Sequence, residues 1–324
     1  MDEAVLDDVY GLNERAALDQ LVNFVVPPLS GGSLALDNRD LEEVELVFSG
    51  WGIPPLTPEL LGRLRSCRII FHAGGTVRPF ATPAMWNRDI RLTSAAEANA
   101  VPVAEFALAS IIFSLKHAWQ RILELRERGE YRRSDPTMPG AFGSTVGLLS
   151  LSRTGRQVAE RLRGFDVKVI AYDPVINPAI ARTLNVELCS LEEIFRRADV
   201  VSCHLPLLPE TNEILGAAQF MGMKPGATFI NTARGGVVRE RELLEVLQRR
   251  ADIFAVLDVV RTEPIPATAR WLRLPNLVVT PHIAGSLGPE CRRMGQFMIA
   301  EVQRYLAGER LLGEVLAADM AFIA

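Results

Sequence analysis

The sequence has no excess of basic residues and no cluster of them. Its 35 Lys and Arg residues are outnumbered by 39 Asp and Glu, which gives a formal net charge of −4. A chain without a basic block has no general electrostatic attraction for phosphate backbones. We therefore expect no nucleic acid partner.

Long apolar runs and paired cysteines are also missing. No uninterrupted apolar run reaches about 18 residues, and no basic segment followed by an apolar one opens the chain, so we expect a cytoplasmic protein without a membrane partner. The four cysteines form no C-x-x-C pair, so buried, reduced thiols are expected. We assign no metal site.

The chain does contain a regular alternation of apolar strand-like runs and amphipathic helical stretches. A length of 324 residues favours two domains. In the second half the predicted strands are 146–151, 167–172, 200–205, 228–231, 253–258 and 277–280, with helices at 155–163 and 240–250. This pattern predicts a parallel sheet covered by helices on both faces.

The first part of the chain repeats the alternation on a smaller scale. Strands are predicted at 45–48, 68–71 and 90–93, which indicates a second α/β domain. From Pro102 to about Arg128 the chain has no further Gly or Pro, so we predict one long helix that starts at the proline and bridges the domains.

A strand–turn–helix segment at residues 145–155 has the order of the dinucleotide fingerprint G-x-G-x-x-G. Ser150 and Ser152 replace the first two glycines, and only Gly155 remains. The serines either crowd the phosphates or donate hydrogen bonds to them, and a βαβ unit that binds no nucleotide is the alternative. Asp173, after the next strand, matches the acid that binds the ribose hydroxyls of NAD and repels the 2′-phosphate of NADP. NAD is therefore favoured.

Four further blocks follow in a fixed order. They are VSCHLPLLPET (201–211), FINTARGG (229–236), LDVVRTEP (257–264) and NLVVTPHIAG (276–285). Together they resemble the D-isomer-specific 2-hydroxyacid dehydrogenase family, which includes glyoxylate and hydroxypyruvate reductases. The resemblance implies an α/β protein in which a Rossmann NAD-binding domain (118–288) is inserted in a smaller, flavodoxin-like α/β substrate domain (1–117), to which residues 289–324 return.

The resemblance also assigns roles to individual residues. It implies that the catalytic residues are Arg234, Glu263 and His282. The cofactor-binding residues that it implies are Ser152, Arg153, Thr154, Gly155 and Asp173 around the loop and ribose, and His204, Pro206, Thr211, Thr232 and Asp258 along the nicotinamide half. For His204, a buried histidine at a strand end is an equally good interpretation.

The chemistry explains why these three catalytic types are needed. Reduction of a 2-oxo acid places a hydride on the carbonyl carbon and a proton on its oxygen. A histidine side chain can change its charge near neutral pH, so His282 can give the proton, and Glu263 can hold the imidazole and favour its protonated form. Arg234 offers a planar fork to the substrate carboxylate and carbonyl oxygen. Taken singly, each residue also has an ordinary explanation: a solvated arginine, a loop glutamate or a histidine at a strand end.

The substrate side depends on two loops of the first domain. In the segment FHAGGTV (71–77) the resemblance implies that backbone amides of Gly75, Thr76 and Val77 bind the substrate carboxylate, and an ordinary strand-to-helix turn is the alternative. Phosphoglycerate-type members carry an arginine in the loop that corresponds to residues 49–52. None is present here, which disfavours a phosphorylated substrate.

These observations predict an NAD-dependent oxidoreductase that transfers a hydride between nicotinamide and a small, non-phosphorylated 2-oxo or D-2-hydroxy acid. One alternative is a non-catalytic, dinucleotide-responsive binding protein of the same fold, and another is oxidation of an oxyanion such as phosphite. The resemblance implies a homodimer, with the helix that begins at Pro102 as the contact.

Overall fold

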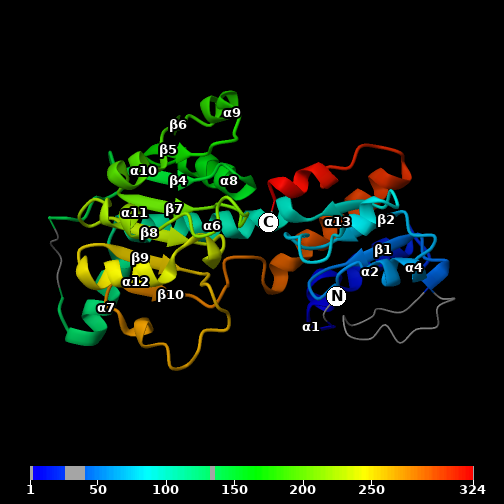
Figure 1. Cartoon of the computed structure of the whole chain (residues 1–324), viewed down its shortest axis with the longest axis horizontal. Helices are drawn as coiled ribbons and strands as arrows, with labels where there is room; N and C mark the ends of the chain where they lie inside the picture. The colour runs from blue at the N-terminus through cyan, green and yellow to red at the C-terminus, as the bar shows by residue number, and fades with distance from the viewer. Residues whose placement is uncertain (1–2, 26–40, 132–135, 324) are drawn as a thin grey trace. The chain divides into compact units, whose positions relative to one another are not determined.

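The structure, a computed structural model, describes residues 3–25, 41–131 and 136–323 (Figure 1). It divides into two compact units, one formed by residues 1–100 with 286–324 and the other by residues 101–285. One unit is therefore inserted in the other, as predicted. The boundaries lie at 100/101 and 285/286, whereas the sequence placed them at 117/118 and 288/289.

The inserted unit contains a seven-stranded sheet in which every pairing is parallel (Figure 1). The strand order is β10-β9-β8-β7-β4-β5-β6. The strands are β4 (Thr145–Leu149), β5 (Lys168–Tyr172), β6 (Glu187–Leu188), β7 (Val200–Cys203), β8 (Thr228–Asn231), β9 (Phe254–Leu257) and β10 (Leu277–Val279). All six predicted strands are present, and the prediction of a Rossmann sheet is confirmed. The two-residue strand β6 was not predicted.

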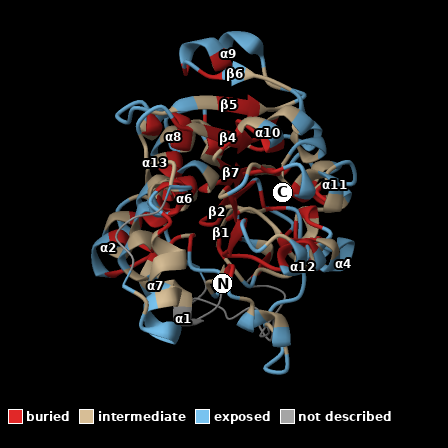
Figure 2. Ribbon diagram, turned by 90° about the vertical axis from the view of Figure 1, so that its left-hand side faces the viewer, coloured by how far each residue is buried: buried red, intermediate tan, exposed pale blue. Residues whose placement is uncertain are grey.

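Alternate residues of the strands enter two separate apolar clusters, one on each face of the sheet. Leu149, Val201 and Phe229 belong to the first cluster, whereas Leu148 and Ile230 belong to the second. Helices α10 (Leu191–Arg197), α11 (Ala217–Met221) and α12 (Glu240–Arg249) cover the first face, and α6 (Ala96–Leu115), α8 (Arg153–Leu162) and α9 (Pro178–Thr183) cover the second. Figure 2 shows the resulting buried strands. Burial on both faces explains why these strands are continuously apolar.

The long helix predicted from Pro102 to Arg128 is wrong at its start and in its middle. Helix α6 begins at Ala96, in an alanine-rich stretch of strong helix formers, so the proline lies inside it. The helix ends at Leu115, and α7 (Ala118–Arg128) follows. His117 separates them in a left-handed conformation (φ 48°), and its ring nitrogen Nε2 lies 3.0 Å from the carbonyl oxygen of Gly226.

Helix α6 also explains the first domain boundary. Four residues of its later turns, Ala104, Ala107, Ile111 and Leu115, are buried in the second cluster of the inserted unit. Among the described residues α6 alone is long and apolar enough to cross a membrane by length and composition, and half of its apolar window is buried within the protein. Its apolarity is therefore used for packing on the sheet.

The other unit contains a three-stranded parallel sheet in the order β1-β2-β3. Its strands are β1 (Leu46–Ser49), β2 (Ile69–His72) and β3 (Arg91–Ser94), and its helices are α1 (Glu3–Val9), α2 (Leu12–Asp19), α4 (Pro58–Arg63), α5 (Pro83–Trp86) and α13 (Cys291–Leu306). The fully buried Glu301 of α13 accepts hydrogen bonds from Thr93 Oγ1 (2.7 Å) and from the backbone amides of Leu312 and Gly313. This carboxylate fixes the returning segment to the sheet.

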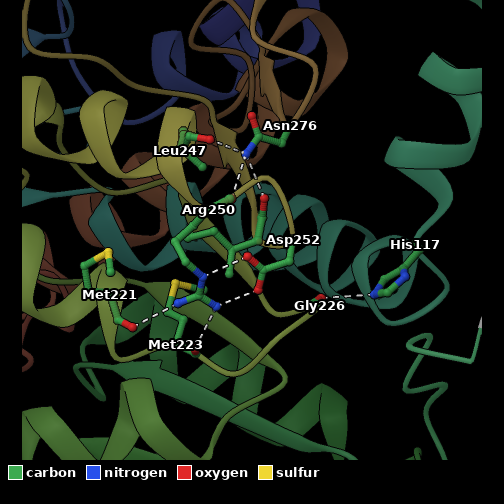
Figure 3. Close-up of polar contacts among 9 residues, drawn as sticks. His117, Met221, Met223, Gly226, Leu247, Arg250, Asp252 and Asn276 are labelled. Carbon is green, nitrogen blue, oxygen red and sulfur yellow. Dashed lines mark hydrogen bonds and ion pairs between the residues drawn. The ribbon is translucent and has the colours of Figure 1, made fainter.

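Side chains bind main-chain groups at the amino edge of the large sheet (Figure 3). Asn276, just before β10, donates from Nδ2 to the carbonyl oxygens of Leu247, Arg250 and Ile253 at 2.9, 3.2 and 3.0 Å. The guanidinium of Arg250 binds both carboxylate oxygens of Asp252 and the carbonyl oxygens of Met221 and Met223. These contacts join the end of α12 to the loops before three strands. Asn276 of the fourth sequence block therefore has a structural role.

An Asn276→Asp variant is expected to lose about 3 kcal/mol of stability, because a buried carboxylate would replace an amide donor opposite three carbonyl oxygens. The midpoint of urea unfolding, followed by circular dichroism, measures the loss. Asn177→Asp is the matched control, since Asn177 Oδ1 accepts a hydrogen bond from Ala179 N (2.9 Å) at the start of α9 and an aspartate can accept it equally well. Equal midpoints for the two variants would contradict the role given to Asn276.

Candidate active site

The carboxyl ends of all seven parallel strands lie on one edge of the large sheet. Strand order reverses at β4, which has β5 on one side and β7 on the other, and such a reversal is where open α/β sheets bind ligands. The predicted residues that follow a strand on this edge are Ser152, Arg153, Thr154 and Gly155 after β4, Asp173 after β5, His204 and Pro206 after β7, Thr232 and Arg234 after β8, Asp258 and Glu263 after β9, and His282 after β10. The fold therefore brings the predicted catalytic and cofactor residues to one edge.

His282 and Glu263 form a direct pair. The ring nitrogen Nδ1 of His282 lies 2.6 Å from Glu263 Oε2, and the imidazole remains 52% exposed. The other oxygen of Glu263 accepts a hydrogen bond from Val260 N (3.0 Å), which fixes the carboxylate relative to β9. With Nδ1 directed to the carboxylate, Nε2 is the nitrogen left to exchange a proton with a ligand.

Asp258 holds the loop that carries His282. Its Oδ1 accepts hydrogen bonds from Thr280 Oγ1 (2.6 Å) and Ile283 N (2.9 Å), and its Oδ2 accepts one from Ala284 N (3.0 Å). His282 has a left-handed backbone (φ 55°) between these anchor points. The sequence predicted Asp258 as a cofactor residue, and in the structure its carboxylate is directed into this loop.

Arg234 projects from a tightly packed turn after β8. Asn231 shapes the turn by accepting from Ala233 N (3.0 Å) and donating to Arg234 O (3.0 Å). A Cβ atom on Gly235 would lie 2.0 Å from the carbonyl carbon of Val260, so only glycine allows the turn to pack against the loop after β9. Burial lowers the pKa of the Arg234 guanidinium, and the charge of Glu263 opposes that shift. Arg234 and the Glu263–His282 pair therefore share one electrostatic environment.

The loop after β4 forms a compact hydrogen-bonded turn despite its two serines. Ser150 occupies the first glycine position with a positive φ of 77°. Ser152 caps α8 by accepting a hydrogen bond from Gly155 N (3.4 Å), and it donates to the carbonyl oxygen of His204 (3.0 Å) across the point where strand order reverses. A Cβ on Gly155 would lie 2.0 Å from Ser150 O. The retained glycine is thus required by close packing of helix and loop.

The edge has polar groups that fit a dinucleotide. Within the described residues, His204 Nδ1 and Thr232 Oγ1 are buried without a hydrogen-bond partner, although they lie just after neighbouring strands. Buried polar groups without partners are costly unless a ligand or water satisfies them. Thr211 and Pro206 shape the adjoining loop, since Thr211 Oγ1 donates to Pro206 O at 2.5 Å. The α8 amino terminus, Asp173 and these orphaned atoms together fit NAD.

The predicted substrate loop lies at the carboxyl end of β2 in the smaller unit. Gly75 and Thr76 are half-buried, whereas the Val77 side chain belongs to an apolar cluster. Asn99, which is not among the predicted site residues, supports this loop: a Cβ on Gly75 would lie 3.0 Å from Asn99 Nδ2, and Asn99 Oδ1 accepts from Ser286 N (3.1 Å). Its position in the alanine-rich start of α6 gave no signal of this role.

Two histidines are buried at strand ends. Burial lowers the pKa of His72 and of His204 to about 4. His72 Nδ1 lies 3.0 Å from Ser49 Oγ, and His204 Nε2 lies 3.1 Å from Ser202 Oγ. Both rings are therefore neutral at physiological pH. The cysteines also follow expectation: all four are free and three are buried, and burial raises the pKa of Cys67 to about 11.

The protein is expected to lose stability as the pH falls from about 6.5 to 4. An unfolded histidine has a pKa near 6.5, so in this range the unfolded chain binds more protons at His72 and His204 than the folded chain does. The stability is fully present above pH 6.5 and is lost toward pH 4. Thermal unfolding at half-unit intervals measures it, and His204→Asn is expected to flatten the slope. A native melting temperature that is constant between pH 6.5 and 5 would contradict this assignment.

Residues 109–284, just over half of the chain, match the family model described as D-isomer specific 2-hydroxyacid dehydrogenase, NAD binding domain. The chain belongs to this family. The matched range contains the loop after β4 with Ser150 and Ser152. It also contains Asp173, Arg234, the Glu263–His282 pair and Asp258. The D-2-hydroxyacid dehydrogenase resemblance seen in the sequence is confirmed, and the inserted unit is the NAD-binding domain of the family.

Relatives of the chain include two D-3-phosphoglycerate dehydrogenases. The protein from Methanocaldococcus jannaschii is 31% identical over 268 residues, which are 82% of this chain and 50% of the relative. The protein from Mycobacterium tuberculosis is 34% identical over 251 residues, which are 78% of this chain and 47% of the relative. The chain thus spans about half the length of these relatives.

Solved structures share the fold. A phosphoglycerate oxidoreductase from Rhizobium etli superposes with a TM-score of 0.79 at 23% identity and covers 97% of both chains. The TT0316 protein from Thermus thermophilus has a TM-score of 0.70 at 27% identity, over 86% of this chain and 88% of that one. The fold of the D-2-hydroxyacid dehydrogenase chain is thus found in experimental structures.

Proposed function

We propose that the chain is an NAD-dependent oxidoreductase that interconverts a small, non-phosphorylated 2-oxo acid and the corresponding D-2-hydroxy acid. The observation that carries the proposal is the 2.6 Å contact between His282 Nδ1 and Glu263 Oε2 on the edge of the NAD-binding domain that also holds Arg234. A proton donor, a residue that orients it and a guanidinium are the groups that carbonyl reduction requires.

Each of the three residues has a distinct part in the proposed reaction. His282 gives a proton from Nε2 to the carbonyl oxygen during reduction and takes it back during oxidation. Glu263 holds the imidazole through Nδ1 and balances the charge of the protonated ring. Arg234 binds the substrate carboxylate and the carbonyl oxygen, where negative charge develops. Bound NAD supplies or accepts the hydride.

The proposed cofactor contacts follow from groups on the same edge. The amino terminus of α8, at Arg153 and Thr154, favours the negative pyrophosphate. Thr232 Oγ1 and His204 Nδ1 offer buried polar atoms that have no partner within the described part of the chain. Asp173 is the acid that meets the adenosine ribose and disfavours a 2′-phosphate.

The charge of the substrate loops supports a non-phosphorylated acid. The loop at 49–52 has no basic residue, and the loop at 73–80 has only Arg78. The Arg78 guanidinium donates to the carbonyl oxygens of Met320 and Ile323 and so holds the carboxy-terminal segment. His72, at the end of β2, is neutral because burial lowers its pKa. The backbone amides of Gly75, Thr76 and Val77 are then the proposed donors to the substrate carboxylate.

Steady-state turnover with a panel of acids tests the proposal. Purified protein is given NADH with glyoxylate, hydroxypyruvate and bulkier 2-oxo acids, and NAD with D-2-hydroxy acids, 3-phosphoglycerate and phosphite. Oxidation of NADH by a non-phosphorylated 2-oxo acid is expected. Faster turnover of 3-phosphoglycerate, as the names of the relatives suggest, would overturn the substrate class. NADH binding without any turnover would support a sensor, and phosphite oxidation would support the oxyanion alternative.

We also propose that the chain forms a homodimer through α6 and α7. Phe113 at the end of α6 and Ile122 and Leu125 in α7 are 44%, 46% and 49% exposed. Exposed large apolar side chains on consecutive helices favour a protein contact. Light scattering measures the mass, and replacing Ile122 and Leu125 together with lysine is expected to shift it to that of a monomer.

A further inference from the structure

The carboxylate of Asp173 is fully engaged by protein groups. Its Oδ2 accepts hydrogen bonds from Leu151 N (2.8 Å) and Ser150 Oγ (3.2 Å), and its Oδ1 accepts from Val175 N and Ile176 N at 3.0 Å each. A carboxylate has about four acceptor positions. All four are taken, although an acid at this position accepts a hydrogen bond from the ribose of NAD.

Ser150 makes the one contact among these four that can be released by a simple rotation. The other three donors are backbone amides, whose positions the fold determines. The Ser150 hydroxyl is held toward Asp173 because it also accepts a hydrogen bond from Ser152 N (3.1 Å), and the residue is 7% exposed. The glycine of the usual fingerprint has no hydroxyl and would leave this position on Oδ2 open.

We propose that Ser150 sets the dinucleotide affinity of this chain and its preference between NAD and NADP, because its hydroxyl competes with the adenosine ribose for Asp173 Oδ2. The inference rests on the proposed function, since it requires the cofactor to meet Asp173. NAD binding turns the Ser150 hydroxyl away from the carboxylate. A 2′-phosphate needs no acceptor on Asp173, and the released hydroxyl can donate to it. The serine therefore weakens NAD binding more than NADP binding.

Fluorescence titration with NADH and with NADPH tests this competition directly. Ser150→Ala removes the hydroxyl but keeps the side-chain carbon at a positive φ. It is expected to lower the Kd for NADH by about threefold to tenfold, as one hydrogen bond allows, and to leave the Kd for NADPH unchanged or higher. The NADPH-to-NADH ratio of Kd values therefore increases.

Ser152→Ala is the matched control in the same loop. The Ser152 hydroxyl contacts Gly155 N and His204 O but does not contact Asp173. Its removal is expected to change the two dissociation constants by the same factor and to leave their ratio constant. In an Asp173→Asn background, Ser150→Ala is expected to leave the Kd for NADH unchanged, because the carboxylate for which the Ser150 hydroxyl and the ribose hydroxyl compete is gone.

The outcomes separate the hydroxyl from the backbone and from the cofactor assignment. Equal NADH affinity of Ser150→Ala and the native chain would overturn the proposal, as would tightening that persists in the Asp173→Asn background. If Ser150→Gly binds NADH more tightly than the native chain but Ser150→Ala does not, the effect comes from relief of the positive φ, and the proposal is also overturned. If Ser150→Ala does not fold, Ser150→Gly in both backgrounds decides. Binding of neither dinucleotide by the native chain would refute the proposed function and this inference together, whereas native turnover with an unchanged ratio would refute only the inference.

Discussion

A His282→Asn variant is expected to lose about 10²-fold to 10⁴-fold in kcat, the usual contribution of a positioned general acid. Asparagine is close in size but cannot give up a proton near neutral pH. The 2.6 Å contact from His282 Nδ1 to Glu263 leaves the other ring nitrogen of His282 for the substrate. His204, which lies on the same edge, cannot replace His282 as the acid because it is buried and its pKa is lowered. Stopped-flow measurement of NADH oxidation at saturating acid gives the rate.

His117→Asn is the matched control for that variant. His117 lies between α6 and α7, and its ring contacts the carbonyl oxygen of Gly226 before β8, at the opposite edge of the sheet (Figure 3). It is expected to keep native kcat and to lose some thermal stability. The NADH dissociation constant of His282→Asn should equal the native value. A loss of less than tenfold in kcat for His282→Asn would refute its role as the acid.

An Arg234→Lys variant is expected to lose about 10²-fold to 10³-fold in kcat/KM for the acid, through both a higher KM and a lower kcat. Lysine keeps the charge but not the planar fork that binds a carboxylate with two parallel hydrogen bonds. The turn also fixes the guanidinium: Arg234 Nη1 donates to Ala233 O at 2.7 Å, and Gly235 packs against Val260. A flexible ammonium cannot reproduce this geometry.

Arg241→Lys provides the comparison, because Arg241 is an exposed residue of α12 that pairs with Glu245 (2.9 Å). It is expected to have native kinetics. A substrate analogue that lacks the carboxylate separates the two contributions of Arg234, since its KM should be insensitive to Arg234→Lys. If Arg234→Lys retains native kcat/KM, charge alone is sufficient and the bidentate assignment is wrong.

The strands of the inserted unit could be predicted from their apolar runs, but the carboxyl ends of β4 and β7 could not. The predicted strands 146–151 and 200–205 continue two residues past the observed ends of β4 and β7. Leu151 and Leu205 are apolar and buried, so the hydrophobic pattern continues although the ladder has stopped. The loops at this edge leave the sheet and are packed as tightly as the strands, and hydrophobicity does not distinguish the two states.

The Glu263–His282 pair could be predicted because both residues lie in the sequence blocks that resemble the family. The contacts that the carboxylates of Asp258 and Asp173 make could not be predicted. Asp258 binds the loop at 280–284 only because β10 lies beside β9. Asp173 meets Ser150 only because β5 pairs with β4, which puts residues 23 positions apart in contact. Such contacts depend on strand order, and local sequence carries no record of it.

The discontinuous unit implies an order of assembly. One of its apolar clusters combines Val9 and Ile69 from the beginning of the chain with Met294, Met298 and Val302 from the end. The inserted unit is continuous, from residue 101 to 285. A ribosome therefore completes it before it has made the residues of α13 that the amino-terminal residues need for their apolar core. Of the two units, the one whose synthesis begins first is therefore expected to acquire its final structure last.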